Sequence, residues 1–92
     1  MEQDRHNIKR IQDEIRKVFM RDWDPIGVND EPACADEYDR YIGPALSILV
    51  NGGTDDDLRE HLGRAENESM SLTPNVDAIE RTVRALRLIP MT

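Results

Sequence analysis

The spacing of the apolar residues is the feature that most restricts the fold of this chain. In four separate stretches they recur at intervals of three and four residues, which is the repeat of an amphipathic helix. Few runs are rich in β-branched or aromatic residues, the usual sign of strands. With 92 residues, the chain is long enough for one domain with a modest core. We predict a single all-α domain over residues 1–92, a compact four-helix bundle.

The first predicted helix spans residues 3–21. Its inward stripe comprises Ile8, Ile11, Ile15, Val18 and Phe19. A connection follows, because Pro25 disfavours helical dihedral angles at the residue before it. Trp23, Ile26 and Val28 make this connection apolar, so we expect it to pack against the bundle.

The second predicted helix runs from about residue 31 to the Asn-Gly-Gly sequence at residues 51–53. Its stripe comprises Tyr38, Tyr41, Ile42, Ala45, Leu46 and Leu49. The stripe keeps its phase through Pro44, although proline cannot donate the backbone hydrogen bond of a helix interior. Since two separate helices would have no reason to share one register, we predict a single helix that is kinked at Pro44.

The last two predicted helices have recognisable starts. Thr54 can cap the third helix, and Asp57 can complete a capping box with it. The inner face of this helix comprises Leu58, Leu62 and Ala65, and its end lies somewhere in residues 66–72. Thr73 and Pro74 are predicted to begin the fourth helix, as a cap followed by proline. Its inner face comprises Val76, Ile79, Val83 and Leu86.

The net charge of −7 is concentrated in residues 22–40, which carry −6. An acidic surface repels phosphates and anionic headgroups, which disfavours binding to nucleic acid or to a membrane. No apolar stretch approaches the roughly 20 residues of a membrane span, and the N-terminus is too polar for a signal peptide. The single cysteine, Cys34, cannot form an internal disulfide. These features predict a cytoplasmic protein.

No combination of residues predicts a catalytic, cofactor or metal site. Asp55, Asp56 and Asp57 are consecutive and point in different directions on a helix, so compensation of the helix dipole explains them better than a cation. Asp57 and His61 can share a helix face, but two residues make a poor site. Cys34 has no neighbouring base. We therefore predict a protein that is not an enzyme and needs no cofactor.

The remaining features favour an interaction with another protein. Tryptophan is common at interface hot spots, although a small core would also use Trp23, and we prefer the core explanation. The acidic stretch can complement a basic surface. The candidate partner-binding residues are Trp23, Asp24, Asp36, Glu37 and Asp39.

Two runs of sequence resemble a pattern in small helical bacterial proteins of unknown function. They are Trp-Asp-Pro-Ile-Gly-Val at residues 23–28 and Asp-Glu-Tyr-Asp-Arg-Tyr at residues 36–41. The similarity extends from the first helix to about Leu72. This resemblance implies a bacterial source and a helical fold. It implies no established activity, so it assigns no catalytic residue.

The sequence thus predicts a non-enzymatic, acidic protein-interaction module with a basic protein as its partner. An immunity or antitoxin-like protein, which neutralises a basic toxin or nuclease, is one concrete version. The first alternative is a small metal-dependent enzyme or metal-binding domain that uses Asp and His side chains. The second is a structural homodimer, in which a second chain completes the core.

Overall fold

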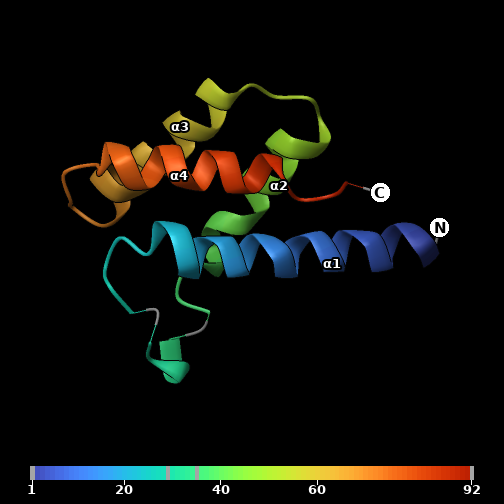
Figure 1. Cartoon of the computed structure of the whole chain (residues 1–92), viewed down its shortest axis with the longest axis horizontal. Coiled ribbons are helices and arrows are strands. Elements are labelled where there is room, and N and C mark those ends of the chain that lie inside the picture. Colours follow the sequence, from blue (N-terminus) through green and yellow to red (C-terminus); the bar gives the residue numbers. More distant parts are fainter. Residues whose placement is uncertain (1, 29, 35, 92) are drawn as a thin grey trace.

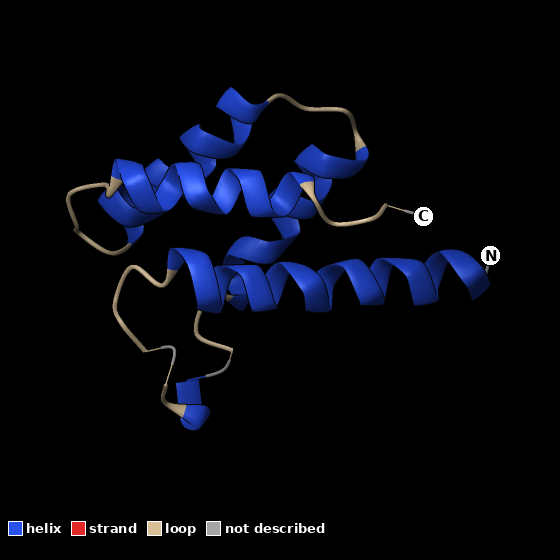
Figure 2. Ribbon diagram, viewed as in Figure 1, coloured by secondary structure: helices blue, strands red, loops and turns tan. Residues whose placement is uncertain are grey.

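The computed structural model describes residues 2–28, 30–34 and 36–91, and the side chains from Asn7 onward. Its elements are α1 (Glu2–Val18), η1 (Phe19–Trp23), η2 (Pro32–Cys34), η3 (Asp39–Tyr41), α2 (Ile42–Val50), α3 (Asp55–Arg64), η4 (Ala65–Ser69) and α4 (Val76–Arg87). The turns η1 and η4 are π-helical, whereas η2 and η3 are 3-10 turns. These residues contain helices and loops but no strand (Figure 2), which confirms the predicted all-α, bundle-like fold with four helices.

The four α-helices pack around one core. The helix α4 contacts both α1 and α3, and α2 contacts the same two helices from another side (Figure 1). Both ends of the chain lie at the same end of the molecule. The buried apolar residues are Ile11, Ile15, Val18, Phe19, Trp23, Tyr38, Tyr41, Ile42, Ala45, Leu58, Leu62, Ala65, Ile79, Val83, Leu86 and Ile89.

The helix α1 buries most of its predicted stripe. Ile11 and Ile15 are almost completely buried, as expected. Ile8 is 43% exposed, so its assignment to the core is wrong. Near Ile8, the Asn7 and Arg10 side chains donate to carbonyl groups of the C-terminal segment. This part of α1 is therefore bonded to that segment and not packed against another helix.

The prediction of one kinked helix over residues 31–50 is wrong. The helix α2 begins only at Ile42, so Pro44 lies in its first turn. The first N–H groups of a helix have no partner within it, and a proline there forfeits no hydrogen bond. Tyr38 and Tyr41 share the stripe of α2 because the 3-10 turn η3 leads directly into that helix. The register is therefore continuous without a kink.

The start of α3 is confirmed and that of α4 is not. Thr54 Oγ1 accepts a bond from the Asp57 amide (3.1 Å), and the Thr54 amide donates to Asp57 Oδ2 (2.9 Å), which completes the capping box. The helix α4 begins at Val76, two residues later than predicted, with Asn75 as its cap. Val76, in the first turn of this helix, is 67% exposed, so its assignment to the inner face is wrong. The buried Glu66 carboxylate accepts a bond from the Asn75 amide, which fixes the chain just before the helix.

Two glycines give a direct test of this packing. A Cβ atom at Gly63, near the end of α3 where the helix continues into η4, would meet nothing within 4 Å, so Gly63→Ala gains helix propensity without a clash. We expect stabilisation by about 1 kcal/mol, or a rise in Tm of about 4–8 °C, measured by thermal denaturation. The Cβ of Gly53→Ala would lie 2.6 Å from Ile48 Cγ2, and this variant should melt below the wild type. Equal Tm values for the two variants would contradict the structure.

Candidate interaction site

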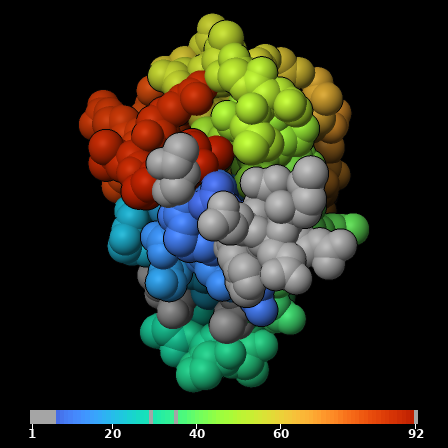
Figure 3. Space-filling view, turned by 90° about the vertical axis from the view of Figure 1, so that its right-hand side faces the viewer, coloured from blue at the N-terminus to red at the C-terminus, as the bar shows by residue number. Residues whose placement is uncertain are grey.

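The candidate site is the acidic loop, which we define as residues 24–39. It contains six Asp and Glu residues and no Lys, Arg or His. The loop leaves the bundle after η1 and projects from the helices before the chain returns at η3 (Figure 1). In the space-filling view the teal part of the loop, around η2, lies at the bottom of the molecule (Figure 3).

Four carboxylates of the acidic loop face solvent. They belong to Asp30, Glu31, Asp36 and Glu37. Within the described residues, none of the four forms an ion pair. Asp36 and Glu37, two of the predicted partner-binding residues, are therefore exposed. Asp30 and Glu31 were not singled out beforehand, although both lie in the acidic stretch that the charge distribution revealed.

The ends of the acidic loop are joined by hydrogen bonds at Asp24, a group of contacts that we call the loop neck. Asp24 Oδ1 accepts bonds from the Tyr38 hydroxyl (2.8 Å) and from the Val28 amide (2.8 Å). The Tyr38 oxygen in turn accepts a bond from the Ile26 amide (3.1 Å). Asp24 also adopts a left-handed backbone, with φ of 34°. Asp24, a predicted partner-binding residue, therefore bonds to the Val28 amide of its own turn and to Tyr38, and these bonds give it a structural role.

Trp23 packs in the core, which confirms the preferred explanation for this residue. It is 3% exposed, and its ring lies 5.0–5.6 Å, between centroids, from the rings of Phe19, Tyr38 and Tyr41. Its Nε1 donates to Oε2 of the equally buried Glu66 (3.3 Å). With its indole enclosed, Trp23 offers no surface to a partner, and we remove it from the partner-binding set.

Asp39 differs from the other candidates because a cation of α1 binds it. Arg16 donates to both carboxylate oxygens of Asp39, at 2.8 Å each. The two residues also line a groove of about 390 Å³ between α1 and the acidic loop, together with Pro32, Ala33 and Asp36. Asp36 and Asp39 therefore meet at one groove. The contribution of Arg16 was not visible in the sequence, where it lies 23 residues from Asp39.

The pair of Asp57 and His61 shares a surface pocket but is occupied with other contacts. With Ile48, Glu60 and Arg64, the pair lines a pocket of about 270 Å³. The His61 Nε2 lies 2.9 Å from the Tyr41 carbonyl oxygen and donates to it, while Asp57 caps α3. Burial lowers the pKa of His61. These contacts explain both residues by folding.

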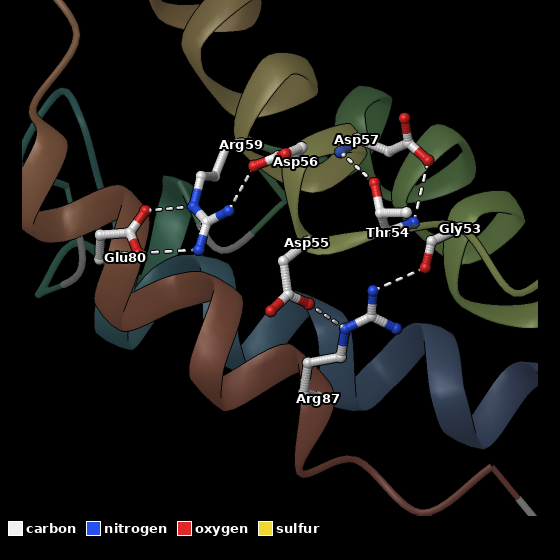
Figure 4. A network of polar contacts seen from close by, with 8 residues as sticks. All are labelled: Gly53, Thr54, Asp55, Asp56, Asp57, Arg59, Glu80 and Arg87. Atoms are coloured by element: carbon white, nitrogen blue, oxygen red, sulfur yellow. Dashed lines mark hydrogen bonds and ion pairs between the residues drawn. The ribbon is translucent and has the colours of Figure 1, made fainter.

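The three consecutive aspartates diverge to three different partners, as a helix requires (Figure 4). Asp55 binds Arg87 of α4, Asp56 binds Arg59, and Asp57 binds Thr54. Arg59 also binds Glu80 through two nitrogens, so this network fastens α3 to α4. In the described part of the chain, no three His, Cys, Asp or Glu side chains gather as metal ligands would. Nor does any helix there have the length and apolarity of a membrane span.

Comparisons with protein-family models, with curated proteins and with solved structures find no match to this chain. The resemblance of residues 23–28 and 36–41 to small helical bacterial proteins therefore stays a prediction. No relative assigns a function to any residue of this chain, so its functional residues are inferred from geometry and charge.

The buried carboxylate of Glu66 gives the first prediction for this region. Glu66→Ala leaves the Trp23 N–H and the Asn75 amide without their acceptor, so we expect a loss of about 1–3 kcal/mol of unfolding free energy in denaturant titrations. Glu68→Ala is the matched control, because Glu68 lies in the same turn with an exposed side chain, and its effect should stay within about 0.5 kcal/mol. Similar losses for both variants would contradict the contacts of Glu66.

The lowered pKa of His61 predicts a pH dependence of stability. The unfolded state binds the proton more tightly than the folded state, so unfolding free energy falls as the pH drops below the ordinary value of 6.5. In His61→Gln this loss is absent, because the glutamine side chain does not take up a proton. Denaturant titrations between pH 7 and about pH 5 should therefore show a wild-type stability that declines faster than that of the variant. Parallel curves would contradict the burial of the imidazole.

Proposed function

We propose that this protein is a non-enzymatic interaction module that binds a basic protein through its acidic loop. The main support is the set of four exposed carboxylates that form no ion pair with the described residues, on a loop whose ends are joined at the loop neck. Carboxylates that no neighbouring cation neutralises leave their field available to a partner. Such a field accelerates association and selects for complementary charge.

The groove beside the acidic loop indicates how a basic side chain would bind. Pro32 and Ala33 supply apolar surface and Asp36 supplies a carboxylate, while the charge of Arg16 in the same groove is paired with Asp39. Lysine and arginine carry an apolar stem with a charged end, which matches such a combination. A joined loop also loses less entropy on binding than a flexible one.

An inhibitor of a basic toxin or nuclease in the cytoplasm is the concrete version that we favour. The surface around a phosphate-binding site is basic, and an acidic loop competes with phosphate for it. No observation on the described residues favours the metal-binding alternative. The exposed large apolar residues lie on different elements (Ile8, Ile26, Val50, Val76 and Leu88), and scattered residues of this kind are normal for a monomer. The homodimer therefore has no specific support either.

Two variants of equal net charge test the proposal. The loop variant replaces the four exposed loop carboxylates: Asp30→Asn, Glu31→Gln, Asp36→Asn and Glu37→Gln. The control variant replaces four exposed carboxylates on α3, η4 and α4: Asp56→Asn, Glu60→Gln, Glu68→Gln and Asp77→Asn. Binding of an arginine-rich synthetic peptide is measured by calorimetry at low and high salt. We expect the loop variant to bind roughly tenfold more weakly than the control variant, with a smaller salt dependence.

The equal charge of the two variants excludes the trivial explanation that any acidic protein attracts a basic peptide. If both lose the same affinity, attraction by net charge alone accounts for binding and the proposed site is wrong. If the wild type does not bind the peptide at low salt, the proposed function itself is wrong. Sedimentation of the wild type, run in parallel, tests the homodimer separately.

A further inference from the structure

We propose that the Tyr38 hydroxyl is a positioning group, which holds the acidic loop in its binding shape and so sets the affinity for a basic partner without touching it. The effect on affinity rests on the proposed function, whereas the effect on the loop does not. Tyr38 is 2% exposed, so a partner that binds the loop surface cannot reach it.

Between the described residues of the acidic loop, the backbone hydrogen bonds are all local and do not join the beginning of the loop to its end. Each runs from one residue to the third residue before it. They link Gly27 to Asp24, Glu31 to Val28, Cys34 to Glu31, Glu37 to Cys34, and Asp39 to Asp36. Such a series of single turns fixes each bend but leaves the shape of the whole loop open. Closing a loop of this length costs conformational entropy, which a contact between its ends must offset.

Among the hydrogen bonds of the described residues, two that join the beginning of the acidic loop to its end involve the Tyr38 oxygen. It donates to Asp24 Oδ1 and accepts from the Ile26 amide, and so bonds to residues 14 and 12 positions away. The bond to Asp24 is charge-assisted, which makes it shorter and stronger than a neutral one. Burial raises the pKa of Tyr38, so the hydroxyl keeps its proton and stays a donor at neutral pH. The ring is fixed in turn by its contact with Trp23.

The backbone of Asp24 adds a second reason for the dependence on Tyr38. A left-handed conformation is uncommon for a residue with a side chain, and it persists where surrounding contacts hold it. Here the same carboxylate oxygen binds both Tyr38 and the Val28 amide. Loss of the Tyr38 hydroxyl removes one of these contacts at the point where the loop leaves the bundle, and the exposed carboxylates then spread over more conformations.

The test compares two tyrosine variants that each lose one oxygen atom from the same aromatic cluster. Tyr38→Phe removes the hydroxyl of the loop neck. Tyr41→Phe is the matched control, because the Tyr41 ring also packs on Trp23 while the loop-neck bonds do not involve it. Solvent exchange of the Glu31 and Cys34 amides is followed by NMR, since Tyr38 bonds to neither. Affinity for the arginine-rich peptide is measured in parallel.

We expect Tyr38→Phe to accelerate exchange of both amides and to weaken peptide binding roughly tenfold, the order expected when a charge-assisted hydrogen bond is lost. The salt dependence of binding should stay unchanged, because no charge is removed. Tyr41→Phe should leave exchange and affinity as in the wild type. Unchanged exchange in Tyr38→Phe overturns the inference, and so does faster exchange with unchanged affinity. A wild type that does not bind the peptide overturns the proposed function, while the exchange data still test the role of Tyr38 in the loop.

A second pair of variants covers the case in which Tyr38→Phe unfolds the protein. Asp24→Asn keeps a side-chain oxygen that accepts from the Tyr38 hydroxyl, and asparagine tolerates the left-handed backbone. Asp24→Ala has no side-chain acceptor, and alanine rarely adopts that backbone. Slow exchange in Asp24→Asn and fast exchange in Asp24→Ala support the inference. Equal exchange in the two variants contradicts it.

Discussion

The burial of Trp23 is the interaction on which the rest of this structure depends. Its indole contacts three other aromatic rings, and these four are the only Phe, Trp and Tyr residues of the chain. It ends the π-helical turn η1, and its N–H binds Glu66 in η4, the second π-helical turn. Single π turns are rare in helical proteins and commonly re-aim a side chain at a functional position. Here the two turns meet at one hydrogen bond, so the end of α1, the end of α3 and the start of α4 are fixed together.

This arrangement also determines how the acidic loop is presented. The loop begins one residue after Trp23, and its far end is held by Tyr38, whose ring packs on the same indole. The core therefore fixes the two ends of the loop, while the carboxylates between them face solvent. A partner would meet a shape that exists before binding, which favours affinity because less freedom is lost. The contact between Trp23 and Tyr38 thus contributes both to the stability of the core and to the function that we propose.

The fold was predictable where short-range patterns determine it. The burial of Ile11 and Ile15 in α1, the capping box of α3 and the burial of Ile79, Val83 and Leu86 in α4 each depend on residues within a few positions of one another. The predictions failed where a residue distant in the sequence determines the bounds of an element. The start of α4 moves to Val76 because Glu66, nine residues before Asn75, binds the amide of that cap. The supposed kink failed for another reason, since periodicity alone cannot tell a proline in a first turn from one in a helix interior.

The candidate site was predictable only as a composition. The acidic stretch was plain from the charges, but the separation of its carboxylates into structural and exposed ones was not. Asp24 and Asp39 are engaged by Tyr38 and Arg16, which lie 14 and 23 residues away in the sequence.

The enclosure of Trp23 can be measured directly, because the protein has no other tryptophan and its fluorescence reports on this contact alone. We predict blue-shifted emission that acrylamide quenches weakly until the protein unfolds. Emission at the wavelength of a water-exposed indole, with strong quenching under native conditions, would contradict the account.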